Sequence, residues 1–159
     1  MGDFKLRYLP FKELPQNIIG RIVSRRWKKE LVLLSEREKE FLYGLEELIG
    51  YKIYISTYYS HKNHKWLKWM SGGSFGKYIC LNNAHDLQTL RHEKGHGEIS
   101  KELGWLYIPC NGIPSVCGNL YDRVAHENWT YKERIKWYYE QPWEKKADEK
   151  GKVKRPWRQ

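Results

Sequence analysis

Long apolar runs and paired cysteines are both missing from this sequence. No apolar stretch approaches the roughly 18 residues that a membrane-spanning helix needs, and the opening MGDFKLRYLP lacks the apolar centre of a signal peptide. The three cysteines, Cys80, Cys110 and Cys117, form no even framework, so we expect reduced thiols. We expect Cys110 and Cys117 to be buried as small apolar side chains. Together these features predict a cytoplasmic protein.

Acidic residues are also in the minority, with 19 Asp and Glu against 29 Lys and Arg, which gives a net charge of +10. Such a charge can attract nucleic acid, anionic lipid or acidic protein, although a solvated basic surface gives the same balance. Aromatic residues are abundant, with eight tryptophans and twelve tyrosines, and predict an aromatic-rich core or groove. A chain of 159 residues suits one domain, which we place at residues 1–150, followed by a frayed basic tail at 151–159.

Hydrophobic periodicity predicts the secondary structure. Helical patterns cover 14–29, 35–50, 87–103 and 130–140, and strand patterns cover 51–59 and 76–82. A short helix should begin at Pro142 and end just before Gly151. The glycine- and proline-containing stretch 104–119 predicts a long connection, and 71–77 a turn into the second strand. We expect the helix at 14–29 to pack its apolar stripe on the core.

Two of these helices carry terminal signals. Asp86 is a good N-cap for the helix at 87–103, and Gly104 stands where a left-handed glycine ends a helix. Ser35 and Glu38 have the spacing of a capping box for the helix at 35–50, and Gly50 would end it.

The helix at 87–103 contains the stretch HEKGH. Residues four apart share one helix face, so His92 and His96 project together and could bind one Zn²⁺. Glu93 follows His92 and could take a proton from a metal-bound water whose pKa the zinc lowers. A solvent-exposed helix face with charged residues and no metal ion would be an alternative explanation of the same sequence. However, Gly95 and Gly97 each cost the helix about 1 kcal/mol relative to alanine, which favours close approach by another element or a substrate backbone.

A catalytic zinc ion needs a third protein ligand. The stretch EKKAD offers Glu144, and Asp148 on the same helix face could orient a ligating histidine through its other ring nitrogen. Solvated ion pairs with the neighbouring lysines would also explain both acids. Rival ligands remain open at this point: Glu127, Glu133, Glu140, Asp122 and His126.

HEKGH at 92–96, followed by Glu-x-x-Ala-Asp at 144–148, resembles the gluzincin type of zinc metallopeptidase. With its flanks, including ELPQNIIG and GWLYIPCNGIPS, the sequence looks like a small group of uncharacterised minigluzincin-like proteins. The resemblance covers roughly residues 13–23 and 75–148. It implies that His92, His96 and Glu144 bind Zn²⁺ and that Glu93 is the base.

The resemblance also implies a compact α+β zincin-like domain, with a small sheet packed on the active-site helix and a C-terminal helix bearing the third ligand. The strand at 76–82 would form the upper rim of the cleft, where a peptide or protein substrate could pair with its edge. No spacing selects an oxyanion-stabilising residue among Tyr121, His126, Tyr138 and Tyr139.

The alternative is a zincin-like binding protein with little or no turnover. Basic and aromatic residues alternate in HKNHKWLKW (61–69) and KVKRPWRQ (152–159), as in surfaces that bind phosphate-bearing partners. The basic amphipathic pattern at 14–29 also suits attachment to a membrane surface.

Overall fold

The computed structural model describes residues 14–27, 36–55, 72–81 and 86–158, and within them the fold is α+β, as predicted. In chain order the elements are α1 (Leu14–Trp27), α2 (Glu36–Ile49), β1 (Lys52–Ile55), β2 (Gly72–Phe75), β3 (Tyr78–Leu81), α3 (Leu87–Leu103), the 3₁₀ turn η3 (Gly104–Leu106), the π-helical turn η4 (Ile108–Gly112), α4 (Ile113–Ala125), α5 (Tyr131–Glu140), α6 (Pro142–Gly151) and the 3₁₀ turn η5 (Pro156–Arg158). None of the helices in these ranges is long and apolar enough to cross a membrane.

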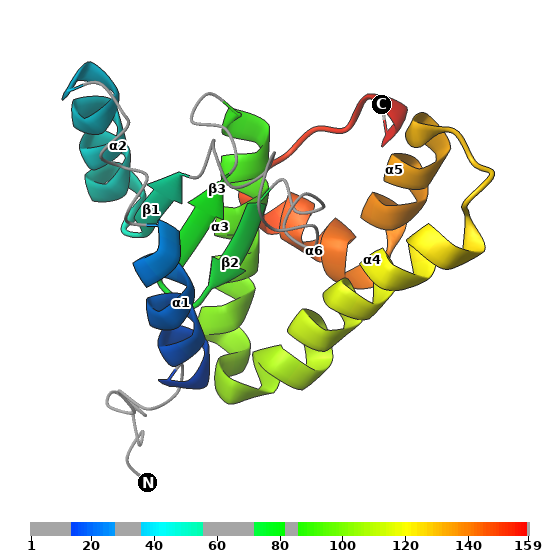
Figure 1. Cartoon of the computed structure of the whole chain (residues 1–159), viewed down its shortest axis with the longest axis horizontal. Helices are drawn as coiled ribbons and strands as arrows, with labels where there is room; N and C mark the ends of the chain where they lie inside the picture. The colour runs from blue at the N-terminus through cyan, green and yellow to red at the C-terminus, as the bar shows by residue number, and fades with distance from the viewer. Residues whose placement is uncertain (1–13, 28–35, 56–71, 82–85, 159) are drawn as a thin grey trace, which may run out of the picture.

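The sheet has the order β1-β3-β2, with β1 parallel and β2 antiparallel to β3. All four residues of β3 are buried because α1 packs on one face of the sheet and α3 on the other (Figure 1). Tyr78 lies against Gly20 of α1, whereas Ile79 and Leu81 join Leu90 of α3 in the core. The prediction that the strand at 76–82 offers a free rim was therefore wrong. That strand is central, and β2 is the strand beside α3 at the sheet edge.

The predicted helix at 87–103 is confirmed at both ends. Asp86 accepts a hydrogen bond from the Thr89 backbone N–H at 2.9 Å, and Gly104 has φ +60°. Gly50 likewise ends α2 with φ +70°. The remaining cap prediction involves Ser35, which lies outside the described residues, as do the strand residues predicted at 56–59 and at position 82.

The stretch 104–119 is helical rather than a long connection. Its two prolines, Pro109 and Pro114, each stand in the first turn of a helical segment, where no backbone N–H is required. The two prolines that predicted turns therefore mark the starts of two helical segments. Cys110 and Cys117 are exposed on these segments, so their predicted burial was wrong, whereas Cys80 is buried in β3; all three are free thiols.

Helices α3 and α6 pack backbone against backbone, which explains two glycines. A Cβ on Gly95 of α3 would collide with the carbonyl oxygen of Ala147, and one on Gly151 of α6 would collide with that of Arg91. Gly151 is thus the last residue inside α6 and not a residue beyond it, and Lys152 takes the left-handed cap with φ +54°. Gly97 leaves room for the ring of Tyr51. The expected close approach at Gly95 and Gly97 is confirmed, and both neighbours belong to the chain itself.

Candidate metal centre

Three buried side chains from α3 and α6 meet at one point. His92 and His96 lie one turn apart on α3, and their Nε2 atoms are 3.1 Å from each other. The Oε2 atom of Glu144, in the first turn of α6, lies 2.9 Å from Nε2 of His92 and 3.2 Å from Nε2 of His96. Among the described residues, His92, His96 and Glu144 form the group of side chains whose ligand atoms lie close enough together to hold a metal ion.

The contact between α3 and α6 that places Glu144 also places Asp148 behind His92. Asp148 Oδ1 accepts a hydrogen bond from Nδ1–H of His92 at 2.7 Å, and the carboxylate is fully buried. The hydrogen bond keeps the proton on Nδ1 and leaves Nε2 directed toward Glu144. This is the arrangement by which a carboxylate fixes the tautomer of a metal-binding histidine.

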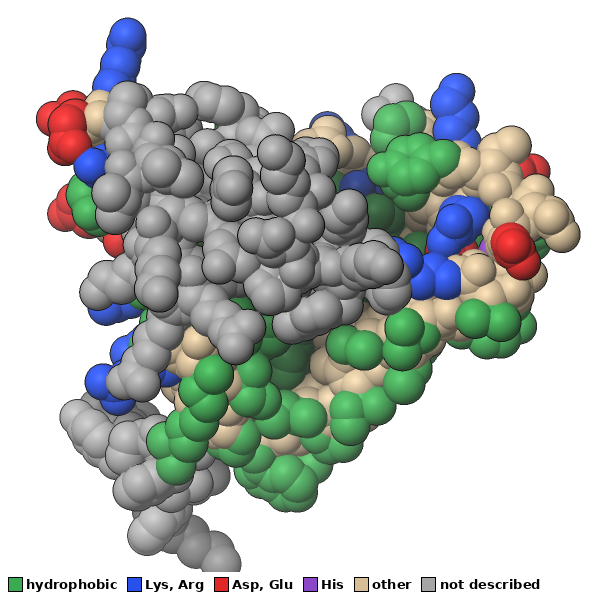
Figure 2. All heavy atoms as spheres, viewed as in Figure 1, with side chains coloured by type: hydrophobic (Ala, Val, Ile, Leu, Met, Phe, Trp, Pro, Cys, Tyr) green, Lys and Arg blue, Asp and Glu red, His purple; other side chains and the backbone are tan. Residues whose placement is uncertain are grey.

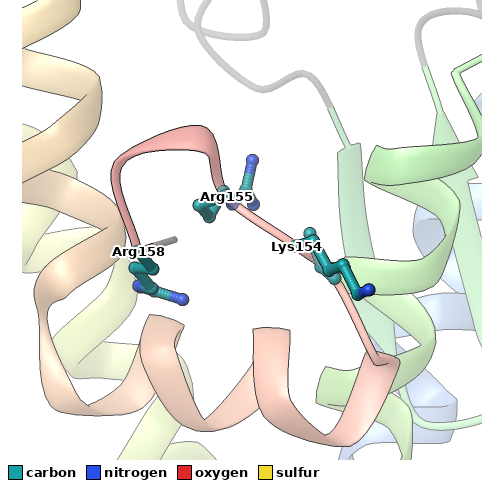
Figure 3. Close-up of a pocket in the computed structure, with 4 residues that line it drawn as sticks. Lys154, Arg155 and Arg158 are labelled. Carbon is teal, nitrogen blue, oxygen red and sulfur yellow. The ribbon is translucent and has the colours of Figure 1, made fainter.

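The C-terminal segment completes the surroundings of Asp148. Arg155 Nε and Nη2 donate to the two oxygens of Asp148 at 2.9 and 2.8 Å, and Arg158 Nη1 donates to Oδ2 at 2.8 Å. Lys154, Arg155 and Arg158, with Val153, line a pocket of about 470 Å³ along this segment (Figure 3). The expectation that residues 151–159 fray is thus wrong for 153–158, because two guanidinium groups are tied to a buried carboxylate.

His96 is oriented by a residue that sequence reasoning missed. The side-chain amide of Asn111, buried in the π-helical turn η4, lies 3.0 Å from Nδ1 of His96. The amide atom that faces Nδ1 of His96 is Nδ2, and if the amide were turned over its oxygen could instead accept a hydrogen bond from Nδ1–H. Single-turn π-helical insertions are often found at functional sites, but nothing in the local spacing marked this asparagine in advance.

Glu144 is held on both sides. Its Oε1 atom accepts hydrogen bonds from Ser115 Oγ at 2.5 Å and from the Tyr138 hydroxyl at 2.8 Å. Its Oε2 atom is therefore the oxygen that faces the two imidazoles. Ser115 comes from α4 and Tyr138 from α5, so four helices fix the cluster. Tyr138 was a candidate for stabilising the oxyanion, but in the structure its hydroxyl donates a hydrogen bond to Glu144.

Glu93 is buried between α3 and the sheet edge. Gly72 of β2 lies so close that a Cβ there would come within 3.0 Å of Glu93 Oε1. Burial raises the pKa of the Glu93 carboxyl, an effect that the nearby imidazoles of His96 and His92 oppose. A carboxyl with a raised pKa is better suited to accept and return a proton near neutral pH than an exposed one.

The charges of the cluster are strongly coupled. Burial disfavours the charged form of His92, but hydrogen bonds to Asp148 and Glu144 outweigh it and raise the pKa of His92 to about 9. Burial alone would raise the pKa of Glu144, yet the imidazoles of His96 and His92 hold it far below its usual range. Glu144 is therefore a buried carboxylate that stays ionised beside the two imidazoles. Buried charged groups of this kind are paired with other charges or coordinate metal ions.

The rival ligands lie elsewhere. Asp122 accepts hydrogen bonds from His126 Nδ1 at 3.1 Å and from Arg134 Nη2 at 2.7 Å. Asp122 and His126 therefore belong to a separate polar group that includes Arg134. Glu133 caps α5 and Glu140 binds Arg158, while Glu127 is exposed.

The remaining predictions concern the oxyanion candidates and the two basic, aromatic segments. Tyr121 and the ring of His126 pack with Trp137 away from the cluster, whereas Tyr139 packs edge-on against His92. The segment 61–69 lies outside the described residues. Of the C-terminal cations, Arg155 and Arg158 pair with Asp148 inside the fold.

The donor set fits a divalent metal ion. Bond lengths of about 2.0–2.1 Å and tetrahedral angles would place zinc ligand atoms about 3.3 Å apart. The three distances of 2.9, 3.1 and 3.2 Å are close to that spacing. Two imidazole nitrogens and one carboxylate oxygen also leave a fourth position for water or substrate. Comparison of the chain with protein-family models, with curated proteins and with solved structures found no match.

Proposed function

We propose that the protein is a zinc-dependent metallopeptidase that hydrolyses peptide bonds. The observation that supports this most is the convergence of His92, His96 and Glu144, with Glu93 buried on the same helix beside them. Two imidazoles and one carboxylate, together with an adjacent carboxyl group, are the residue types that metal-assisted hydrolysis requires.

Each residue has a distinct role in this proposal. His92, His96 and Glu144 would hold the metal through Nε2, Nε2 and Oε2. Asp148 keeps the proton of His92 on Nδ1, and Asn111 holds the ring of His96 through its Nδ1 atom. A zinc ion held there would lower the pKa of a water molecule and polarise the substrate carbonyl. Glu93 takes the proton from that water as it attacks the carbonyl carbon. It then delivers the proton to the amine nitrogen that leaves when the C–N bond breaks.

The test is cleavage of a proteome-derived peptide library by the zinc-loaded protein, read by mass spectrometry. We expect new peptide termini with the wild type, none after chelation, and recovery when zinc is returned. Glu93→Gln is expected to keep the metal and lose at least about 100-fold of the rate, because it removes only the proton acceptor. Glu98→Gln, on the same helix but hydrogen-bonded to Tyr51, is the matched control and should cleave normally. Equal cleavage by wild type and Glu93→Gln would contradict the proposed role of Glu93.

A further inference from the structure

Helix α1 turns its apolar residues outward. Gln16, Gly20 and Ser24, spaced four apart, are buried against the rest of the fold, and Gln16 donates to the carbonyl oxygen of Gly104. On the opposite side Ile18 and Ile22 are half exposed or more, and Leu14 and Ile19 are also exposed. The expected packing of the apolar stripe on the core is wrong, because Gly20 lets α1 approach Tyr78 of β3 and Phe75 of β2 closely.

Helix α4 also has small and polar residues on its inward side and apolar residues on its outward side. Its inward side carries Ser115, which binds Glu144, then Gly118 against Trp143, then the ion-paired Asp122. Its outward side is apolar, with exposed residues at helical spacing: Ile113, Val116, Leu120, Tyr121 and Val124. A helix in contact with water on its outer side normally has the reverse pattern.

The two outward sides belong to one surface. The turn η3 packs between α1 and the helices that follow it, and it adds the exposed side chains of Trp105 and Leu106. Figure 2 shows hydrophobic side chains gathered along the lower edge of the view, over α1, the η3 turn and α4. We call this surface the apolar face; it holds eleven of the fifteen exposed large hydrophobic side chains found in the described residues. Contiguous exposed apolar surfaces of this kind mark contacts with protein or membrane.

The charge around the apolar face indicates which contact. Helix α1 contains no Asp or Glu, and the stretch 104–125 contains one acidic residue, the buried and paired Asp122. Arg21 is exposed beside the apolar residues of α1, and the whole chain carries a net charge of +10. An apolar surface without free acids, on a basic protein, is complementary to a membrane with anionic headgroups.

We propose that the apolar face rests on the surface of an anionic lipid bilayer, with its aliphatic side chains at the level of the headgroups. The proposal does not depend on the proposed peptidase function. It extends membrane contact from the basic segment at 14–29 to a surface that also includes η3 and α4.

The test is flotation of the full chain with vesicles of phosphatidylcholine, with and without phosphatidylserine. The face variant is Ile22→Asn with Val124→Asn, at positions that are 62% and 82% exposed. The matched control is Tyr43→Asn with Tyr131→Asn, at positions 60% and 78% exposed on α2 and α5. Both pairs keep the net charge and replace exposed apolar side chains on helices. Circular dichroism verifies that each variant is folded.

We expect the wild type to float with phosphatidylserine-containing vesicles, less so as salt is added. The face variant should lose about tenfold or more in partitioning, since two inserted aliphatic side chains are removed, and the control should partition like the wild type. Glu93→Gln should also float normally, which separates this proposal from the peptidase proposal. The proposal is overturned if the wild type stays at the bottom of the gradient, or if face variant and control partition equally. It is also overturned if the wild type ignores vesicles but forms dimers that the face variant does not form.

Discussion

At the scale of the residue, Glu144 is the most heavily constrained side chain of the cluster. Four groups surround its carboxylate: the imidazoles of His92 and His96 on one oxygen, and the hydroxyls of Ser115 and Tyr138 on the other. Burial raises the pKa of the Tyr138 hydroxyl well above its ordinary value, so it remains a donor at any physiological pH. The second oxygen therefore stays in place while the first faces the imidazoles.

Removing the Tyr138 hydroxyl should loosen the cluster without abolishing it. We expect Tyr138→Phe to weaken zinc binding by about tenfold, because outer hydrogen bonds of this kind typically contribute 10- to 100-fold to metal affinity. Tyr131→Phe, which removes the hydroxyl of an exposed tyrosine on the same helix, is the control. Competition with a chromophoric chelator measures both. An unchanged affinity in Tyr138→Phe would mean that Ser115 alone positions Glu144.

At the scale of the element, the metal centre depends on how closely α3 approaches α6. Because Gly95 and Gly151 lie in the contact, the two helix backbones meet where any Cβ would overlap a carbonyl group. The same approach places Glu144 and Asp148 opposite His92. The glycines within HEKGHG are thus required by helix packing, in addition to any need of a substrate.

We expect Gly95→Ala to destabilise the fold by about 2 kcal/mol or more and to weaken zinc binding, because α6 must move away from α3. The control is Gly44→Ala in α2, where an added Cβ meets nothing within 4 Å. That change should stabilise the protein by about 0.5–1 kcal/mol, because alanine is the better helix former. Urea unfolding of the two variants measures the difference. Equal stability of both would contradict the close contact of α3 and α6.

The elements differ in how far the sequence predicts them. The helix at 87–103 was predictable because Asp86 and Gly104 are local signals that act within one turn. Residues 104–119 were misread because Pro109 and Pro114 have the same local signature in a turn and at a helix start.

The pairing of HEKGH with EKKAD was recognisable as a pattern. The contributions of Asn111 and Ser115 were not, since they depend on packing between helices that no local spacing specifies.

At the scale of the whole molecule, the C-terminal segment is part of the site's support. Arg155 and Arg158 share the carboxylate of Asp148 with His92. Burial opposes ionisation of Asp148, but hydrogen bonds from His92 and Arg155 hold its pKa below the usual range. A carboxyl with a lowered pKa stabilises the fold above its unfolded pKa, near 3.9, and this contribution is lost as the pH falls through the lower folded value.

Replacing both arginines by glutamine should therefore destabilise the chelator-treated protein by about 2 kcal/mol or more at neutral pH. It should also shift acid unfolding to higher pH, because the pKa of Asp148 moves up. The control is Lys152→Gln with Lys154→Gln, which removes the same charge from exposed positions of the same segment. Thermal and acid unfolding, followed by circular dichroism, compare the pairs. If both pairs unfold alike, the segment does not support Asp148.

The measurement that tests the central claim most directly is the metal content of the purified protein by mass spectrometry, after dialysis against zinc and then against buffer. We predict about one zinc ion per chain in the wild type and almost none in His96→Ala or Glu144→Ala. Glu149→Ala, an exposed carboxylate on the same helix as Glu144, should retain the full content. Zinc retained in Glu144→Ala, or absent from folded wild type, would contradict a metal centre formed by His92, His96 and Glu144.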